Sequence, residues 1–208
     1  MEVPKKPWSK LGWEKAMFVL QKEHQNWIDK NFTAEEHAAW MQLLGMVKGL
    51  GEFVFLIREY ANSVNMDREC TNFVHMTGPY GGITPILEQM AEAICSIIFY
   101  AAGYCNEMGW LLGDLTSSFK SSERVLDAHR TKYVDSSMLL GHVGGVCHNH
   151  LMAIQEPNEA EWYTTSGRSF LKRLLEALFE VAQSNSIDLL KALQGAWEAK
   201  VESQVGEK

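Results

Sequence analysis

The stretch that decides the fold is "LLGMVKGLGEFVFLIREY", residues 43–60. Its apolar side chains recur at helical spacing, so it predicts a long, mostly apolar helix. Gly49 and Gly51 lie inside this helix, beside Lys48 and Glu52. Glycine costs about 1 kcal/mol relative to alanine within a helix, so these two residues need a reason other than helix propensity. The pattern indicates that these two glycines serve a contact that the helix makes, and not the stability of the helix itself.

Another amphipathic helix precedes this one, over residues 12–30. We expect it to stop near Asn31. Thr33 and Glu36 then have the spacing of a capping box, which predicts that the helix carrying 43–60 begins there. The apolar side chains of the first helix recur every three or four positions and form one stripe. They are Trp13, Met17, Leu20, His24, Trp27 and Ile28.

Two further helices are expected in the first half of the chain. Residues 63–84 are rich in turn-forming residues and have no sustained period, so they predict a long connection. Pro85 suits the first turn of the helix that follows, over 86–108. That helix is apolar on nearly all sides, as a central element of a bundle would be, and Gly109 ends it. A fourth helix is expected over 111–129.

The second half of the chain repeats the opening stretch. "LLGMVKGLGEF" at 43–53 matches "LLGHVGGVCHN" at 139–149 in Leu-Leu-Gly, in a valine and in a later glycine. A shared spacing of this kind indicates that one unit was duplicated. We therefore expect 43–60 and 139–155 to be related by an approximate two-fold axis.

The remaining segments complete an all-α fold. Residues 157–169 predict another turn-rich connection, and 170–184 and 187–203 predict a second pair of helices. The expected product is a bundle of about seven helices that packs as one globular unit. Its two halves, 1–135 with the N-terminal helix and 136–208, would form a pseudo-dimer within one chain.

Composition and charge limit the partners. The chain has 208 residues, of which 46% are hydrophobic, and this is enough for a sizeable core. Its net charge of −7 argues against nucleic acid, because affinity for a phosphate backbone comes from lysine and arginine. The longest apolar run, 93–105, is too short to span a bilayer, and "MEVPKKPWSK" lacks the apolar core of a secretory signal. We expect a cytoplasmic protein that binds neither nucleic acid nor membrane.

The cysteines do not have the spacing of a metal site. Cys70, Cys95, Cys105 and Cys147 are far apart, and no two form a CxxC pair. Two of them lie within apolar runs, where a reduced cysteine packs as a small hydrophobe. Free thiols in the core are therefore favoured over metal ligands.

Three segments together resemble a known family. "QKEHQNWIDKNF" at 21–32, "LLGMVKGLGEF" at 43–53 and "EAICSIIFYAAGYCNEMGW" at 92–110 resemble successive helices of MazG-like nucleoside triphosphate pyrophosphohydrolases. This is the all-α superfamily that includes the dimeric dUTPases. The resemblance covers residues 12–135 in order and, more faintly, 139–203.

The resemblance implies a magnesium site with some ligands missing. In the family, an E-E-x-G-E motif and an acid-x-x-x-Asp pair hold Mg²⁺, and a metal-bound water attacks between the α and β phosphorus atoms. This sequence matches the pattern at Glu52 and Glu92, which become the expected metal ligands. Lys48 and Gly49 stand in place of the glutamate pair, and Ser96 stands in place of the aspartate. The second repeat keeps no carboxylate at these positions; it has Gly144, Gly145, His148, Ser169 and Arg173.

The resemblance also implies a nucleotide pocket. Lys48 and Ser96 would contact phosphate, Trp27 would stack on the base and Asn31 would read the base edge. An equally simple interpretation places Trp27 in the core. Glu88 and Glu92 share a helical face and could act as an acid and base pair, although one of them also suits a solvated charge at a helix start.

Three nearby histidines do not predict a zinc site. At 100° per residue, His148 is rotated about 240° from His142 and about 200° from His150, so their side chains diverge. They suit a polar helix face better than a metal site.

Two classes of function follow from these observations. One is a MazG-like protein that has lost hydrolysis and binds a nucleotide or another protein. Such a protein could also form a homo-oligomer. The other is an active Mg²⁺-dependent pyrophosphohydrolase that releases NMP and pyrophosphate with a reduced carboxylate set. The replacements at 48, 49 and 96 favour the first class.

Overall fold

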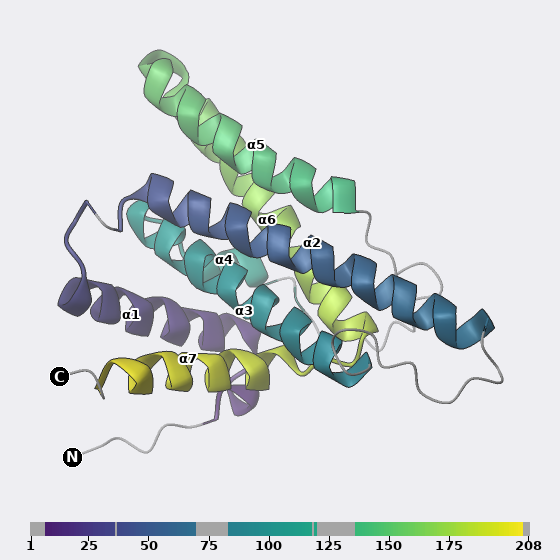
Figure 1. The fold of residues 1–208 in the computed structure, drawn as a ribbon. Helices are drawn as coiled ribbons and strands as arrows, with labels where there is room; N and C mark the ends of the chain where they lie inside the picture. The colour runs from purple at the N-terminus through teal and green to yellow at the C-terminus, as the bar shows by residue number, and fades with distance from the viewer. Residues whose placement is uncertain (1–6, 36, 70–82, 118, 120–135, 206–208) are drawn as a thin grey trace.

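The computed structural model describes residues 7–35, 37–69, 83–117, 119 and 136–205, which form an all-α bundle (Figure 1). No strand occurs within these ranges, and the expected bundle of about seven helices is confirmed. The elements are η1 (Trp8–Lys10), α1 (Trp13–Asn31), α2 (Ala39–Glu69), α3 (Ile83–Glu107), α4 (Leu112–Thr116), α5 (Ser136–Gln155), η2 (Pro157–Glu159), α6 (Ala160–Ser184) and α7 (Leu189–Val205).

Two long helix pairs make up most of the bundle. The most extensive contacts join α2 to α3 and α5 to α6, and the two pairs meet where α2 contacts α5. Helix α3 lies at the centre, with α1, α4, α6 and α7 also against it (Figure 1). Each half of the repeat therefore forms one pair. The approximate two-fold relation between the halves stays a prediction.

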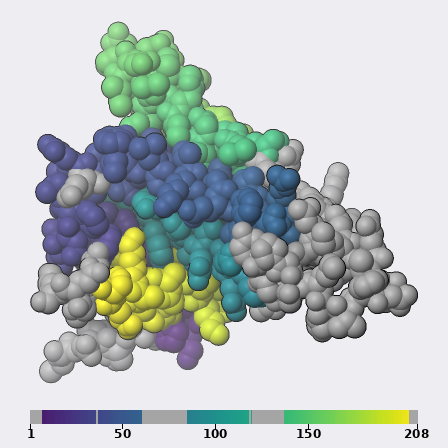
Figure 2. Space-filling view, viewed as in Figure 1, coloured from purple at the N-terminus to yellow at the C-terminus, as the bar shows by residue number. Residues whose placement is uncertain are grey.

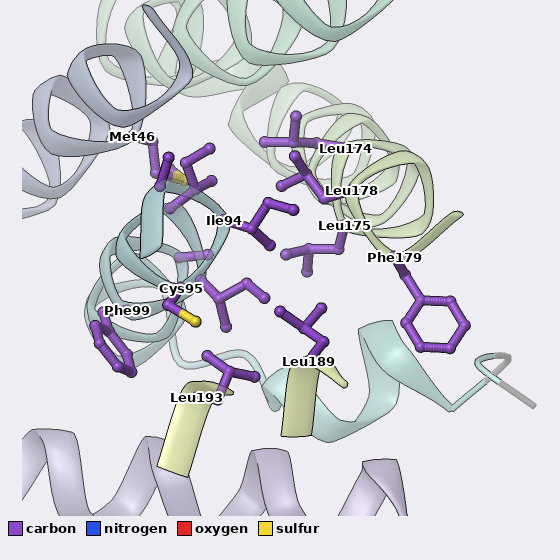
Figure 3. Close-up of a cluster of buried hydrophobic side chains, with 14 of the residues drawn as sticks. Met46, Ile94, Cys95, Phe99, Leu174, Leu175, Leu178, Phe179, Leu189 and Leu193 are labelled. Carbon is purple, nitrogen blue, oxygen red and sulfur yellow. The ribbon is translucent and has the colours of Figure 1, made fainter. Parts of the chain in front are cut away.

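One hydrophobic core joins both halves of the chain. Its buried side chains come from every α-helix, and the largest group lies on α3. Figure 3 shows the region where α3, α6 and α7 converge, with Ile94 and Cys95 facing Leu175 and Leu189. Burial of an aliphatic side chain of this kind stabilises the fold by about 1.5–3 kcal/mol.

The glycines of the opening stretch let α2 approach α3 closely. A Cβ atom added at Gly49 would lie 3.0 Å from Ile97 Cγ1, and one at Gly45 would overlap the Tyr100 ring. The equivalent glycine of the second repeat, Gly145, lies against Phe170 of α6, whose ring a Cβ would approach to 2.6 Å. Packing against the following helix therefore accounts for the glycine at both equivalent positions.

The expected start and end of α2 were both wrong. The helix begins at Ala39, and not at the capping box of Thr33 and Glu36; Glu36 lies outside the described residues. In the link before α2, His37 Nδ1 lies 3.0 Å from Glu107 Oε1 at the end of α3, a long-range contact that local capping did not anticipate. At its other end α2 continues to Glu69, because no glycine or proline interrupts it.

The boundaries of the other helices were predicted in part. Helix α3 begins at Ile83, which puts Pro85 in its first turn as expected. Helix α4 ends at Thr116, whose hydroxyl donates back to the carbonyls of Leu112 and Gly113 at 3.2 Å each. The expected continuation of this helix to 129 was wrong, because Ser117 and Phe119 are not helical; 118 and 120–129 lie outside the described residues.

The expected connection over 157–169 was also wrong. Pro157 begins the short helix η2, and α6 follows directly from Ala160. Gly167 is buried inside α6, where an added Cβ would lie 3.3 Å from Asn149 Cβ on α5. Packing on α5 therefore outweighs the weak helix propensity of the threonines and the glycine in this segment.

Two helices are long and apolar enough to cross a membrane. The windows are 39–60 in α2 and 85–107 in α3, both longer than the apolar run on which the sequence argument relied. The two helices pack against each other and supply much of the core, and core helices of soluble proteins pass the same test. The expectation of no membrane partner therefore rests on this burial and stays a prediction.

Candidate functional site

A groove of about 660 Å³ runs between α2 and α3. Its polar side chains are two exposed glutamates, Glu52 and Glu92, together with Gln89 and the half-buried Ser96. Its apolar wall includes Phe55 and the backbone of Gly51. The described residues that line it are Gly51, Glu52, Phe55, Leu56, Gln89, Glu92, Ala93 and Ser96.

Helical spacing brings these side chains together. On α2, Glu52 is followed three and four positions later by Phe55 and Leu56. On α3, Gln89, Glu92 and Ser96 lie at positions i, i+3 and i+7. Residues at these intervals share one helix face, so each helix directs one polar and apolar strip toward the groove. The groove therefore unites Glu52, Glu92 and Ser96 from separate segments of the sequence.

Lys48 lies beside the groove, outside its lining. Its Nζ atom is 3.9 Å from Glu52 Oε1, one helical turn away, and both side chains are more than half exposed. An exposed pair of this kind contributes about 0.3–0.5 kcal/mol. Lys48 is therefore an exposed positive charge next to one of the two carboxylates.

Position 49 is more tightly packed than the other positions of the missing ligands. A Cβ atom there would lie 3.0 Å from Ile97 Cγ1, tighter than an ordinary van der Waals contact, so a glutamate at 49 requires Ile97 to shift by a few tenths of an ångström. Lys48 is exposed and Ser96 is half-exposed, so these two positions offer more room for a restored carboxylate.

Trp27 and Asn31 are not among the residues that line the groove. The Trp27 ring packs 6.2 Å from Trp197 of α7, and Lys200 Nζ lies 4.5 Å above its centroid. Asn31 Nδ2 donates to the carbonyl of Trp27 at 2.7 Å, at the end of α1. The structure therefore favours the core interpretation of Trp27 and gives Asn31 a local role at a helix end.

Neighbouring His24 is buried against the same aromatic cluster. Its side chain is 3% exposed and its ring lies 5.9 Å from that of Trp197. Burial, together with the positive charge of Lys200, lowers the pKa of His24 to about 3. The ring is therefore neutral at physiological pH and serves as a packing group.

The three histidines of α5 face different neighbours. His150 Nδ1 lies 3.2 Å from the hydroxyl of Tyr104, whereas the His142 ring lies 6.3 Å from that of Phe170, and His148 is exposed. Among the described residues, no group of three or more histidine, cysteine, aspartate or glutamate side chains is arranged to hold a metal ion.

The described cysteines behave as packing groups. Cys95 and Cys105 are free and buried, as expected, and burial raises the pKa of each thiol to about 12. Cys147 is half-buried and its pKa is also raised by burial. Cys70 lies outside the described residues. These thiols are therefore protonated at neutral pH and poor metal ligands.

The groove can hold a cation more readily than an anion. Two carboxylates from neighbouring helices can supply two oxygen ligands to Mg²⁺, which then keeps positions for water or phosphate oxygens. Hydrolysis needs more than this, because the site must also orient and activate a water molecule. The neighbouring Glu88 is exposed on α3 and does not line the groove, so it is not placed to pair with Glu92 there.

Four of the lining side chains were not predicted from the sequence. Gln89, Phe55 and Leu56 carry no motif, although each lies three or four positions from Glu92 or Glu52, and Ala93 lies three positions before Ser96. Extending the helical face from the two glutamates and from Ser96 would have found them.

Neither a protein-family model, nor a curated protein, nor a solved structure matches the chain.

Proposed function

We propose that this chain is a MazG-like protein that binds a nucleotide together with Mg²⁺ in the groove between α2 and α3, without hydrolysing it. The observation that carries this proposal is that Glu52 and Glu92, on different helices, line one groove. The same two residues are the ones that the family resemblance implies as metal ligands.

The metal is needed for charge reasons. Two carboxylates repel a triphosphate, and the single ammonium group of Lys48 beside them does not reverse the sign. Glu52 and Glu92 would hold Mg²⁺, whose two positive charges would offset the repulsion between these carboxylates and the phosphates. Binding should therefore require the metal and the nucleotide together, and either one alone should bind weakly.

The rest of the groove suits the remainder of a nucleotide. Its volume of about 660 Å³ lies in the range of small-molecule sites, about 300–1,000 Å³. Gln89 and Ser96 offer hydrogen-bond donors and acceptors, while Phe55 and Leu56 offer an apolar wall for a base.

The absence of hydrolysis follows from the ligand count. Among the described residues that line the groove, only Glu52 and Glu92 carry a carboxylate, so none of the others can activate a water molecule as a base of this kind. Lys48 also competes for Glu52, and Ser96 is a weaker metal ligand than an aspartate. Two carboxylate ligands are enough to hold a Mg²⁺–nucleotide complex, but a hydrolytic centre needs further groups to orient and activate a water molecule.

Calorimetric titration tests the binding. Each common (d)NTP is added in Mg²⁺ and, separately, in chelator, to wild type, Glu52→Gln and Glu92→Gln. We expect binding of at least one nucleotide in Mg²⁺ only, weakened about tenfold or more by either substitution. Glu88→Gln is the matched control on the same helix and should bind like wild type. Equal binding with and without Mg²⁺ would remove the proposed role of the two glutamates.

A pyrophosphate-release assay decides between the two classes of function. The same nucleotides are incubated with Mg²⁺ or Mn²⁺, and we expect no release above the uncatalysed background. Turnover at an ordinary enzymatic rate, about 1 per second or faster, would establish the alternative, an active pyrophosphohydrolase.

A further inference from the structure

A second concave site lies where α5 joins α6. Its volume is about 710 Å³, and the described residues that line it are Asn158, Glu159, Glu161, Trp162, Tyr163 and Thr165. Figure 2 shows this end of the α5–α6 pair projecting beyond the rest of the bundle. The site shares none of these residues with the groove between α2 and α3, so it needs an explanation of its own.

Trp162 supplies an exposed aromatic surface to this site. The residue is 64% exposed, and its ring centroid lies 4.9 Å from that of Tyr163, with the two planes at 80°. The hydroxyl of Tyr163 donates to Glu156 Oε2 at 3.1 Å. The edge-to-face contact and this hydrogen bond hold the pair of rings in position. A tryptophan ring that is held in place and left largely in water is typical of the residues that dominate binding interfaces.

The charge around this ring is negative. Glu159 and Glu161 line the site, and Glu156 lies beside it through its hydrogen bond with Tyr163. The sequence has no lysine or arginine from 136 to 167, which covers α5, η2 and the first turns of α6. Acidic residues suit the amino end of a helix, but Glu159, the N-cap of α6, makes no side-chain hydrogen bond to that end. Capping of α6 therefore does not account for the position of Glu159.

From the exposed ring and the negative charge beside it, we propose that this site docks an arginine side chain in a basic segment of another protein. A guanidinium group is planar, so it can stack on the Trp162 ring while its N–H groups donate to the carboxylate of Glu159 or Glu161. The volume of the site also admits the peptide residues beside the arginine, whose backbone amides can pair with the polar side chains of Asn158 and Thr165. The proposal is independent of nucleotide binding, because the two sites lie on different helices.

Calorimetric titration with a capped tetra-arginine peptide tests the proposal, at low ionic strength and without Mg²⁺ or nucleotide. Wild type should bind the peptide, and Trp162→Ala should weaken binding about tenfold or more. The matched control is Trp40→Ala, which removes another exposed tryptophan, on α2 and outside the site. The control should bind like wild type. Circular dichroism establishes that both variants stay helical.

Charge variants and two other cations test which chemistry the site recognises. The double variant Glu159→Gln/Glu161→Gln should weaken peptide binding about fivefold or more. Glu180→Gln/Glu202→Gln makes the same change of net charge at two exposed positions outside the site and should bind like wild type. A tetra-lysine peptide and the free polyamine spermine should both bind wild type more weakly than the tetra-arginine peptide, because neither has a planar group to stack on the ring.

Four results would each overturn the proposal. The first is a wild type that does not bind the tetra-arginine peptide, and the second is binding that survives Trp162→Ala. The third is an equal loss of binding in Trp40→Ala or in Glu180→Gln/Glu202→Gln, since the attraction would then come from the charge or surface of the whole protein. The fourth is tetra-lysine or spermine binding as tightly as tetra-arginine, since the site would then recognise positive charge alone.

Discussion

Two adjacent glycines of α5 should respond differently to the same substitution. A Cβ atom at Gly144 would meet nothing within 4 Å, whereas one at Gly145 would lie 2.6 Å from the Phe170 ring. Alanine at an exposed helical position is worth about 1 kcal/mol over glycine, so Gly144→Ala should stabilise the fold by about that amount. Gly145→Ala gains the same propensity term but must displace the ring of Phe170.

The displacement sets the magnitude at Gly145. Overpacking a core contact costs about 1–3 kcal/mol, which exceeds or cancels the gain of about 1 kcal/mol in helix propensity. We therefore expect Gly145→Ala to be less stable than Gly144→Ala by about 1–3 kcal/mol. For a chain of this length, each kcal/mol corresponds to about 2–4 °C in Tm. Urea unfolding followed by circular dichroism, with thermal scans beside it, resolves a difference of this size.

Removing the ring should reverse the sign. In a Phe170→Ala background, the obstacle to the added methyl group is gone, so Gly145→Ala should then stabilise by about 1 kcal/mol, as Gly144→Ala does. If Gly145→Ala already stabilises the wild-type chain, or if its effect does not change in the Phe170→Ala background, close packing of α5 on α6 is not the reason for the glycine.

Three other predictions follow from the buried cluster and the groove. The pKa of His24 is about 3 in the folded chain and about 6.5 in the unfolded chain, so the unfolded chain binds a proton more readily. The free energy of unfolding should therefore be constant above pH 6.5 and fall by about 1.4 kcal/mol for each pH unit below it. His24→Gln should flatten this dependence, as measured by urea unfolding between about pH 7 and 5. Lys200→Met removes a charge that lowers the pKa of His24, so an NMR titration should show that pKa rising, while Lys200→Arg should leave it nearly unchanged. The double variant Lys48→Glu/Ser96→Asp should be stabilised by Mg²⁺, by about 2.7 kcal/mol when Mg²⁺ is at a hundredfold excess over its Kd, and wild type should be stabilised much less. An equal gain in both proteins would contradict the proposed ligand set.

The helices that could be predicted are those whose signal is local. The apolar periodicity of 43–60 and 86–108 places α2 and α3 correctly, because each buries a broad face along its whole length. The start of α6 could not be predicted, because the burial of Gly167 against Asn149 depends on a different helix. The polar composition of 63–69 does not predict the continuation of α2 to Glu69, because only the lack of glycine and proline in this segment favours a helix there.

The residues of the candidate site also differ in whether a local sequence pattern predicts their surroundings. Glu52 and Glu92 were identified through motif positions on two helices that pack along each other, and they line one groove. Trp27 was assigned to a base pocket from its position in α1, but its surroundings are set by Trp197 and Lys200, near the other end of the chain. No local pattern specifies such a neighbour, because long-range packing decides which face of α1 is covered by α7.

The geometry of the groove depends on two glycines of α2. Gly45 and Gly49 let α2 settle against Tyr100 and Ile97 of α3, and the register of that contact also decides which turn of α2 faces Glu92. A larger residue at either glycine would push α2 away from α3 and widen the separation between the carboxylates of Glu52 and Glu92. Mg²⁺ demands near-ideal octahedral geometry with oxygens at about 2.0–2.1 Å, so in the proposed magnesium site a small shift of the helix would lower metal affinity before it lowered the stability of the fold. The glycines that weaken α2 as an isolated helix are thus the residues that hold the two halves of the candidate site in register.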